Sequence, residues 1–149
     1  MHLRHASKML WSLAVLAAAF GFGIEASAQE VQAELRILNV EPKGGTVYVA
    51  VYESAESYKA QKAYKGFILE PESGTLRLSL SLPKGDYMVS IFQDRNGNGK
   101  LDTNFLGIPK ELVGISNYDG KGLPGGFAKH KVSLGDGAAA VEIKLLRML

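Results

Sequence analysis

Cysteine is absent from the chain, and histidine is scarce. No disulfide can hold the domain together, no cysteine can serve as a nucleophile, and a lipid-anchored start, which requires a cysteine, is excluded. Only His130 lies beyond the first five residues, so a zinc site built from several His or Cys ligands is excluded as well. The domain must therefore be stabilised by core packing, with help from any ion that binds to it.

A strong excess of charge of either sign is also missing. The chain has 17 basic and 15 acidic residues, and a net charge near +1 is left when residues 1–28 are set aside for the reason given below. Proteins that bind nucleic acid or an anionic membrane surface usually carry a pronounced basic field. We therefore expect neither of these partners.

Only one long apolar run occurs, at residues 9–24 (MLWSLAVLAAAFGFGI). Basic residues precede it and Ala26-Ser27-Ala28 follows it, which is the pattern of a secretory signal peptide. The run is shorter than the roughly 20 residues of a spanning helix, and an uncleaved membrane anchor is the alternative. We predict a signal peptide at 1–28 and an exported protein, periplasmic or secreted, with no membrane contact after cleavage. The remaining residues, 29–149, suit a single domain.

Beyond this run, helical periodicity is weak and apolar residues recur mostly with period two. The alternation predicts half-buried strands at 33–37, 47–51, 76–82, 87–91, 131–134 and 141–145. Residues 54–65 are expected to form a brief helix or an irregular excursion. Glycine and proline turns separate the strands. The pattern predicts an all-β fold, an antiparallel β-sandwich.

One segment, residues 94–130, breaks this pattern because it contains no convincing strand or helix. Loops longer than about 12–15 residues in compact domains are usually functional, disordered or misassigned. Ten large apolar residues in the segment provide enough surface for it to pack down. We therefore predict one long ordered loop whose start is pinned by a local interaction.

The stretch "DRNGNGKLD", residues 94–102, is the best candidate for that interaction. Calcium takes six to eight oxygen ligands, and an EF-hand loop supplies them from alternate positions with a glycine at position 6. In that frame Gly99 falls at position 6, and positions 1, 3, 5, 7 and 9 are Asp94, Asn96, Asn98, the Lys100 carbonyl and Asp102. These residues predict a metal site with calcium as the cofactor.

Two features weaken the match to an EF-hand. Position 12, which should be a bidentate glutamate, is Phe105, and the preceding residues alternate like a strand. With two carboxylates, we expect weak binding, with a Kd of roughly 0.1–1 mM. A metal-free turn is the alternative, because Asn-Gly pairs at 96–97 and 98–99 form turns and Asx hydrogen bonds unaided. Asp102 favours the cation, since a turn needs no carboxylate there.

The stretch "FQDRNGNGKLDTNFLGIPKELVGISN", residues 92–117, resembles the signature of the bacterial domain of unknown function 2141 family. "LPKGDY", ahead of it, is also similar to that family. The resemblance implies an exported protein of about this size, and the family has no assigned activity.

"LPKGDY" resembles, in addition, a turn of prealbumin-like and immunoglobulin-like sandwiches, in which Gly85 permits the bend and Tyr87 packs inward. Wall-anchored adhesin repeats of similar fold carry a comparable Asp-x-Asn-x-Asn-Gly loop that holds calcium. This likeness implies a metal at the same loop here and a structural role.

Signals for an enzyme are few. There is no Gly-x-Ser-x-Gly elbow, and the Gly-x-Gly-x-x-Gly match at 120–125 follows no predicted strand and contains Pro124. We favour a non-enzymatic module that presents its long loop to an envelope or extracellular protein or glycan. A sugar or small-molecule binding module is the alternative, with the aromatic residues of the loop lining a groove, namely Tyr118, Phe127 and Phe105. A hydrolase that uses the Asp94 and Asp102 carboxylates is a third hypothesis.

Overall fold

The structure is a computed structural model that describes residues 28–137 and 139–148. Its elements are β1 (Glu30–Leu38), β2 (Thr46–Tyr52), α1 (Ala55–Lys59), β3 (Lys65–Leu69), β4 (Thr75–Pro83), β5 (Gly85–Asp94), β6 (Leu112–Ile115), α2 (Phe127–His130), β7 (Val132–Leu134) and β8 (Ala139–Lys144). The predicted signal peptide, apart from Ala28, lies outside the described residues. No helix within the described ranges is long and apolar enough to cross a membrane.

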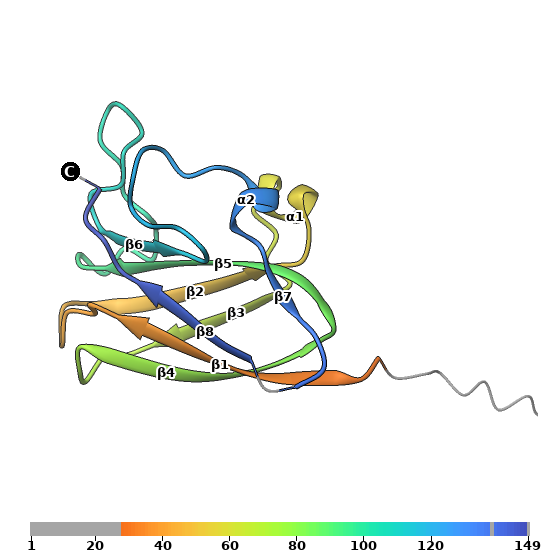
Figure 1. The fold of residues 1–149 in the computed structure, drawn as a ribbon. Helices are drawn as coiled ribbons and strands as arrows, with labels where there is room; N and C mark the ends of the chain where they lie inside the picture. Colours follow the sequence, from red (N-terminus) through yellow and green to blue (C-terminus); the bar gives the residue numbers. More distant parts are fainter. Residues whose placement is uncertain (1–27, 138, 149) are drawn as a thin grey trace, which may run out of the picture.

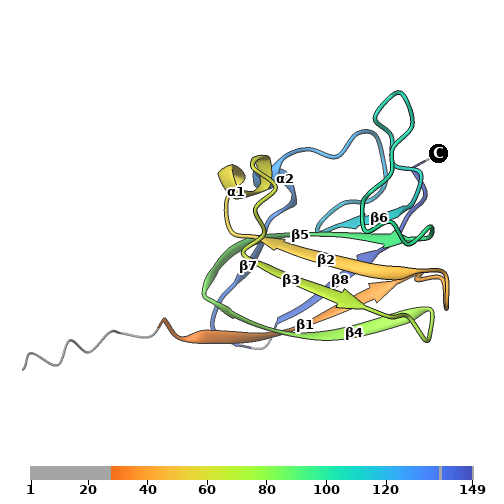
Figure 2. The ribbon, with the colours of Figure 1, turned by 180° about the vertical axis from the view of Figure 1, so that it is seen from behind.

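The strands form two sheets that lie against each other (Figures 1 and 2). One sheet has the order β4-β1-β8, and the other has the order β3-β2-β5-β6, with β7 paired to the start of β5. The predicted all-β sandwich is therefore confirmed. One pair departs from the antiparallel pattern, because β1 and β8 run parallel.

The core lies between the sheets and follows the period-two pattern of the sequence. In β1, for example, Ala33, Leu35 and Ile37 are buried, whereas the residues between them are partly exposed or exposed. The partner strands of both sheets contribute alternate residues in the same way, among them Val47, Val49, Val51, Leu80, Leu82, Val89, Ile91, Val141 and Ile143. Burial of one face of each strand thus stabilises the sandwich.

The prediction of an uninterrupted loop over residues 94–130 is wrong, because β6 and α2 lie within it. β6 has the sequence LVGI and shows no alternation, since both of its faces are covered. Gly114 fits there because a Cβ at this position would lie 2.7 Å from Ile143 Cγ2. β6 divides the segment into a first loop, residues 95–111, and a second loop, residues 116–126.

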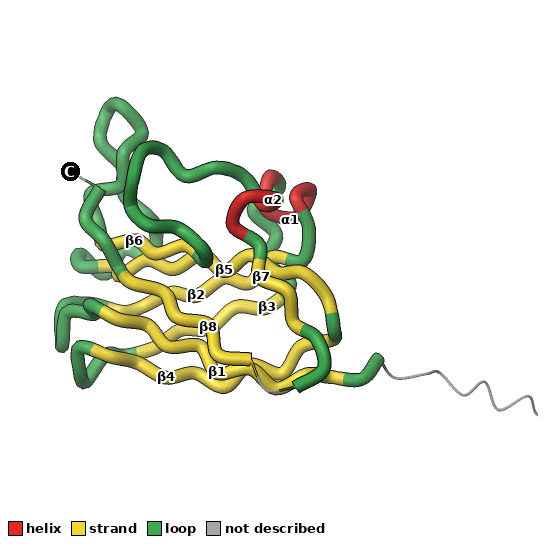
Figure 3. The backbone as a smooth tube through the Cα atoms, in the orientation of Figure 1, coloured by secondary structure: helices red, strands yellow, loops and turns green. Residues whose placement is uncertain are grey.

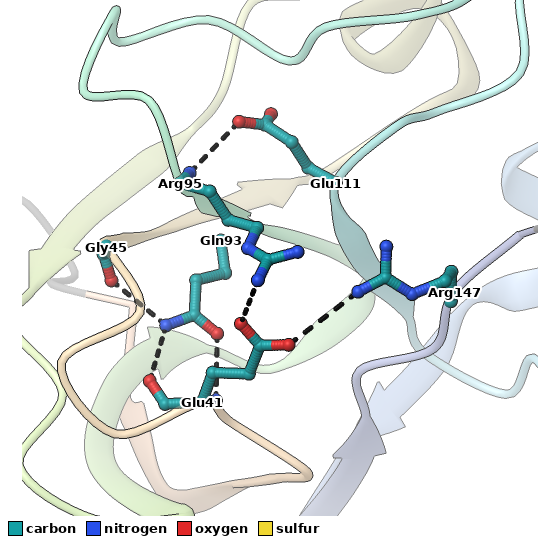
Figure 4. Close-up of polar contacts among 6 residues, drawn as sticks. All are labelled: Glu41, Gly45, Gln93, Arg95, Glu111 and Arg147. Atoms are coloured by element: carbon teal, nitrogen blue, oxygen red, sulfur yellow. Dashed lines mark hydrogen bonds and ion pairs between the residues drawn. The ribbon is translucent and has the colours of Figure 1, made fainter.

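A polar network around the buried Gln93 side chain fixes the end of β5, where the first loop begins (Figure 4). The Gln93 side chain is fully buried. Its amide oxygen accepts a hydrogen bond from the Glu41 N–H at 2.9 Å. Its amide nitrogen donates to the Glu41 carbonyl at 2.8 Å and to the Gly45 carbonyl at 3.0 Å. The Glu41 carboxylate in turn pairs with Arg95 at 3.2 Å and Arg147 at 3.7 Å. The turn before β2 is therefore fastened to the residue that precedes Asp94.

Gly45 is the position in this network that tolerates a side chain least. Its φ is +109°, and a Cβ there would lie 1.9 Å from the Asp94 carbonyl oxygen. We predict that Gly45→Ala lowers the free energy of unfolding by about 2 kcal/mol or more, because backbone strain and the clash act together. Urea denaturation measures this loss. Gly135→Ala is the matched control, since a Cβ there meets nothing within 4 Å; equal losses in the two variants would contradict the prediction.

Candidate metal loop and its surroundings

Asp94 is the last residue of β5, and its side chain organises the loop that follows. The residue is 1% exposed. One carboxylate oxygen accepts from the Gly97 N–H at 2.9 Å and the other from the Gly99 N–H at 2.7 Å. Gly97 and Gly99 have φ values of +70° and +72°, a region that side chains rarely adopt. The chain therefore winds tightly around one carboxylate.

Asn96 and Asn98 continue the same pattern. The side-chain oxygen of Asn96 accepts from the Asn98 N–H at 3.1 Å, and that of Asn98 accepts from the Lys100 N–H at 2.9 Å. The amide nitrogens of Asn96 and Asn98 both donate to Asp102, at distances of 2.6 to 3.1 Å. The Asp94 carboxylate thus bonds to backbone amides, whereas Asp102 is joined by two other side chains that the sequence predicted as ligands, those of Asn96 and Asn98. Their amide nitrogens, and not their oxygens, are the groups turned toward Asp102.

Glu111 joins this cluster, and sequence reasoning missed it. It is 4% exposed and lies at the end of the first loop. One of its oxygens accepts from the Arg95 N–H at 3.1 Å and the other from the Asp102 N–H at 3.2 Å. Glu111 lies outside the EF-hand frame, nine residues beyond Asp102, so ligand spacing gave no sign of it. An acidic residue directly before an apolar run was the available signal.

The pKa values of two carboxyls in the cluster move in opposite directions. Burial alone would raise the pKa of Asp94, but the hydrogen bonds donated by the loop amides, chiefly that of Gly99, outweigh it and lower this pKa. Burial raises the pKa of Glu111; its two backbone hydrogen bonds oppose the rise, and the negative charges of Asp94 and Asp102 add to it. The site therefore holds Asp94 firmly ionised and disfavours the charge on Glu111.

The remainder of the first loop forms a narrow finger, visible beyond β6 in Figure 3. The Asp102 carbonyl accepts from the Lys110 N–H, and residues Thr103 and Pro109 form a bridge. At the tip, Phe105 is 95% exposed and Leu106 is 67% exposed. The base of this finger is the carboxylate cluster, so the cluster sets where the finger leaves the sandwich.

His130 closes the second loop. The residue is fully buried; its Nε2 accepts from the Gly125 N–H at 2.9 Å, so its Nδ1 carries the proton and donates to the Asn117 carbonyl at 3.1 Å. The Ser116 hydroxyl donates to the His130 carbonyl at 2.6 Å and accepts from the Val89 N–H at 3.0 Å. Both ring nitrogens and the carbonyl of His130 therefore form hydrogen bonds that stabilise the second loop.

A cavity of about 450 Å³ lies between the two loops and the outer face of the β3-β2-β5-β6 sheet. Of the three aromatic residues expected in a groove, Tyr118 lines this cavity, whereas Phe105 and Phe127 do not. Phe105 extends into solvent at the finger tip, and Phe127 begins α2. A groove lined by all three aromatic residues is therefore not formed, and the walls of this cavity come mostly from other residues.

Two further observations bear on the chemistry of the cluster. Within residues 28–137 and 139–148, no three His, Cys, Asp or Glu side chains are arranged as a ready-made metal site.

Both oxygens of Asp94 accept backbone hydrogen bonds, and its pKa is lowered, so it is poorly suited to donate a proton as a glycosidase acid must. The geometry therefore disfavours the hydrolase hypothesis.

The opposed pKa shifts predict a specific pH dependence. Asp94 contributes stability that is present above its ordinary pKa and is lost as the pH falls below about 4. Glu111 has the opposite sign: its contribution is full below its ordinary pKa and is lost as the pH rises through its raised pKa. In a carboxyl-carbon NMR titration without calcium, we expect Asp94 to titrate below the usual aspartate range and Glu111 above the usual glutamate range. The reverse order would contradict this description of the cluster.

Comparison with known proteins gives one finding. No curated protein and no solved structure matches the chain significantly. The model of one family, described as an uncharacterized protein conserved in bacteria (DUF2141), matches residues 35–142. This match spans the sandwich from β1 into β8 and includes both loops and the carboxylate cluster. The chain therefore belongs to the DUF2141 family of uncharacterized bacterial proteins.

Proposed function

We propose that this DUF2141 protein is an exported, non-enzymatic binding module, and that a calcium ion in the 94–102 loop fixes the surface that it presents. Export is supported by the basic start, the short apolar run and the small residues at 26–28. The binding surface is formed by the two loops above the sheet. The calcium part of the proposal rests on the ligand spacing of residues 94–102 and on the buried Glu111 carboxyl beside them.

The observation that carries the proposal is the burial of Glu111 beside two other carboxylates. Its charge is disfavoured by burial and by Asp94 and Asp102, as its raised pKa expresses. A divalent cation among these groups would reverse that repulsion and favour the ionised form. Glu111 also supplies the third carboxylate that the EF-hand frame lacked at position 12. The ligands would be Asp94, Asn96, Asn98, the Lys100 carbonyl and Asp102, with Glu111 added.

Binding in this way requires a local rearrangement. The amides of Asn96 and Asn98 must turn their oxygens inward and give up the hydrogen bonds to Asp102. That cost opposes binding and is consistent with the weak affinity expected from the sequence, roughly 0.1–1 mM. The metal-free turn is the competing arrangement, and its hydrogen bonds are complete without an ion.

Calcium at the cluster would act on the finger, because the cluster forms its base. Glu111 accepts hydrogen bonds from Arg95 and Asp102, which lie on the opposite side of the first loop. Fixing these contacts fixes the direction of the apolar tip, where Phe105 and Leu106 are exposed. Exposed apolar side chains on an ordered loop suit contact with a partner, which we propose is an envelope or extracellular protein or glycan.

A small-molecule binding module is the second candidate function. The cavity beneath the loops favours it, because its volume of about 450 Å³ lies within the range of small-ligand sites. The two functions are compatible, since the finger that calcium would hold also lines this cavity through Leu106 and Ile108.

We predict that calcium raises the melting temperature of the mature domain and that a chelator reverses the rise. At calcium concentrations ten to a hundred times the Kd, binding to the folded state alone adds about 1.4–2.7 kcal/mol of stability, which corresponds to roughly 5–10 °C for a domain of this size. Asp94→Ala, Asp102→Ala and Glu111→Gln should each remove most of this rise. Differential scanning calorimetry measures it.

The control is Asp119→Ala in the second loop, because Asp119 also caps a turn by accepting from a backbone amide, that of Lys121. This variant should retain the calcium-dependent rise. If the unaltered protein melts at the same temperature with calcium and with chelator, the calcium proposal fails. Asp102→Asn keeps the size of the side chain and an acceptor oxygen but removes the charge. It should also lose most of the calcium-dependent rise, and it serves as the test if Asp94→Ala does not fold.

A further inference from the structure

The outer face of the β3-β2-β5-β6 sheet is apolar, whereas the solvent-facing side of a sandwich is usually polar. The strand register places two adjacent rows of side chains across this face, Ile68-Tyr48-Phe92-Val113 and Gly66-Ala50-Ser90-Ile115. The Tyr48 and Phe92 rings stack with their centroids 4.9 Å apart and their planes at 10°. A sheet face of this composition is suited to being covered by another molecule or by the chain itself.

Two neighbouring cavities lie on this face, and together they are called the trough. The first, of about 450 Å³, lies under the two loops, and the second, of about 500 Å³, extends toward β3. Four lining residues are common to both, namely Gln61, Ser90, Phe92 and Leu101. The loops cover one part of the sheet face and leave the remainder open (Figures 1 and 2). α1 lies beside α2, which follows the second loop. The trough is therefore a built feature, with a floor of strands and walls of loops.

No described residue that lines either cavity carries a charge, although 21% of the chain is charged. Two other hollows of the described surface differ in this respect: one contains Glu34 and Arg36, and the other contains Arg95, Asp102, Lys110 and Glu111. A charged group placed in the trough would lose water without gaining an ionic partner, which is costly. Charge complementarity therefore selects an uncharged ligand.

The polar side chains that line the trough are Gln61, Ser90 and four tyrosines, Tyr48, Tyr52, Tyr58 and Tyr118. Those of Tyr52, Gln61 and Tyr118 are already paired within the protein. The Tyr118 hydroxyl donates to the Gly122 carbonyl at 2.6 Å, and the Gln61 amide donates to the Tyr58 carbonyl at 2.7 Å. Ser90 lies on the floor, where it pairs with Ala50 of β2 and Ile115 of β6. A sugar needs partners for several hydroxyls close together, whereas the other three hydroxyls are spread over the two cavities, with Tyr58 in one, Tyr48 in the other and Ser90 common to both.

We propose that the trough binds an uncharged, elongated, mainly hydrocarbon molecule with one or two hydroxyl or carbonyl groups. The four strands of the floor span roughly 14 Å at the usual strand spacing, which suits a medium-length alkyl or isoprenoid chain. The Ser90 hydroxyl meets the polar group of the ligand, and the Tyr48–Phe92 stack packs along its body. This inference rests on the second function proposed above and does not depend on calcium.

The test is displacement of the uncharged dye Nile red from the mature domain, followed by fluorescence. Decanol should displace the dye, and decanoate, which has the same chain length but a charge, should do so at least about tenfold more weakly at neutral pH. Ser90→Leu and Ala50→Leu fill the floor from adjacent strands, and each should weaken decanol binding by about tenfold or more. Ser79→Leu, on the outer face of β4 in the other sheet, is the matched control and should bind as the unaltered protein does.

Maltotriose is included so that failure of the ligand class can be distinguished from failure of the binding-module function. If maltotriose binds and Ser90→Leu abolishes it while decanol has no effect, the hydrocarbon proposal is wrong and the binding module stands. If neither molecule binds the folded domain, both proposals fall. Equal displacement by decanol and decanoate, or equal losses in Ser90→Leu and Ser79→Leu, would also overturn the proposed site. Thermal melting of each variant confirms that the compared proteins are folded.

Discussion

The arrangement of the first loop depends on the buried Asp94 carboxylate at the end of β5. Two loop amides donate to it, so the chain turns back over the sheet and does not run on into solvent. The returning strand, β6, then brings Glu111 against the same turn, where it accepts from Arg95 and Asp102. Asp94 therefore determines where the finger starts, and Glu111 determines where it ends. A buried charge is tolerated there because backbone N–H groups replace water as its partners.

Four consecutive residues at the end of β5 contact, in turn, the core, the trough, the turn before β2 and the first loop. Ile91 faces the core, Phe92 faces the trough, Gln93 holds the turn before β2, and Asp94 begins the loop. Alternation of a strand's side chains explains the first three directly. The position of β5 between β2 and β6 makes this strand rigid. The proposed calcium loop and the proposed trough are thus built on the same rigid strand, although each can be tested without the other.

The sequence alone predicted the parts that depend on local pattern. Alternation identified the core strands, such as the run that contains Leu35 and Ile37, and spacing placed Asn96 and Asn98 in one loop with Asp102, to which both donate. β6 was missed because a four-residue apolar strand covered on both faces has no period-two signal. Glu111 was missed because it reaches the cluster through strand pairing and not through loop spacing. The parallel pairing of β1 with β8 likewise depends on tertiary contacts that no local pattern encodes.

Membership of the DUF2141 family is established by the match over residues 35–142, and the family description assigns no activity. The central claim of this account is that the carboxylate cluster is a calcium site. A crystal structure grown in millimolar calcium tests it most directly. The account predicts anomalous density at roughly 2.3–2.6 Å from oxygens of Asp94, Asp102 and Glu111, with the amide oxygens of Asn96 and Asn98 turned inward. Absence of density, with both asparagine amides still donating to Asp102, would contradict it.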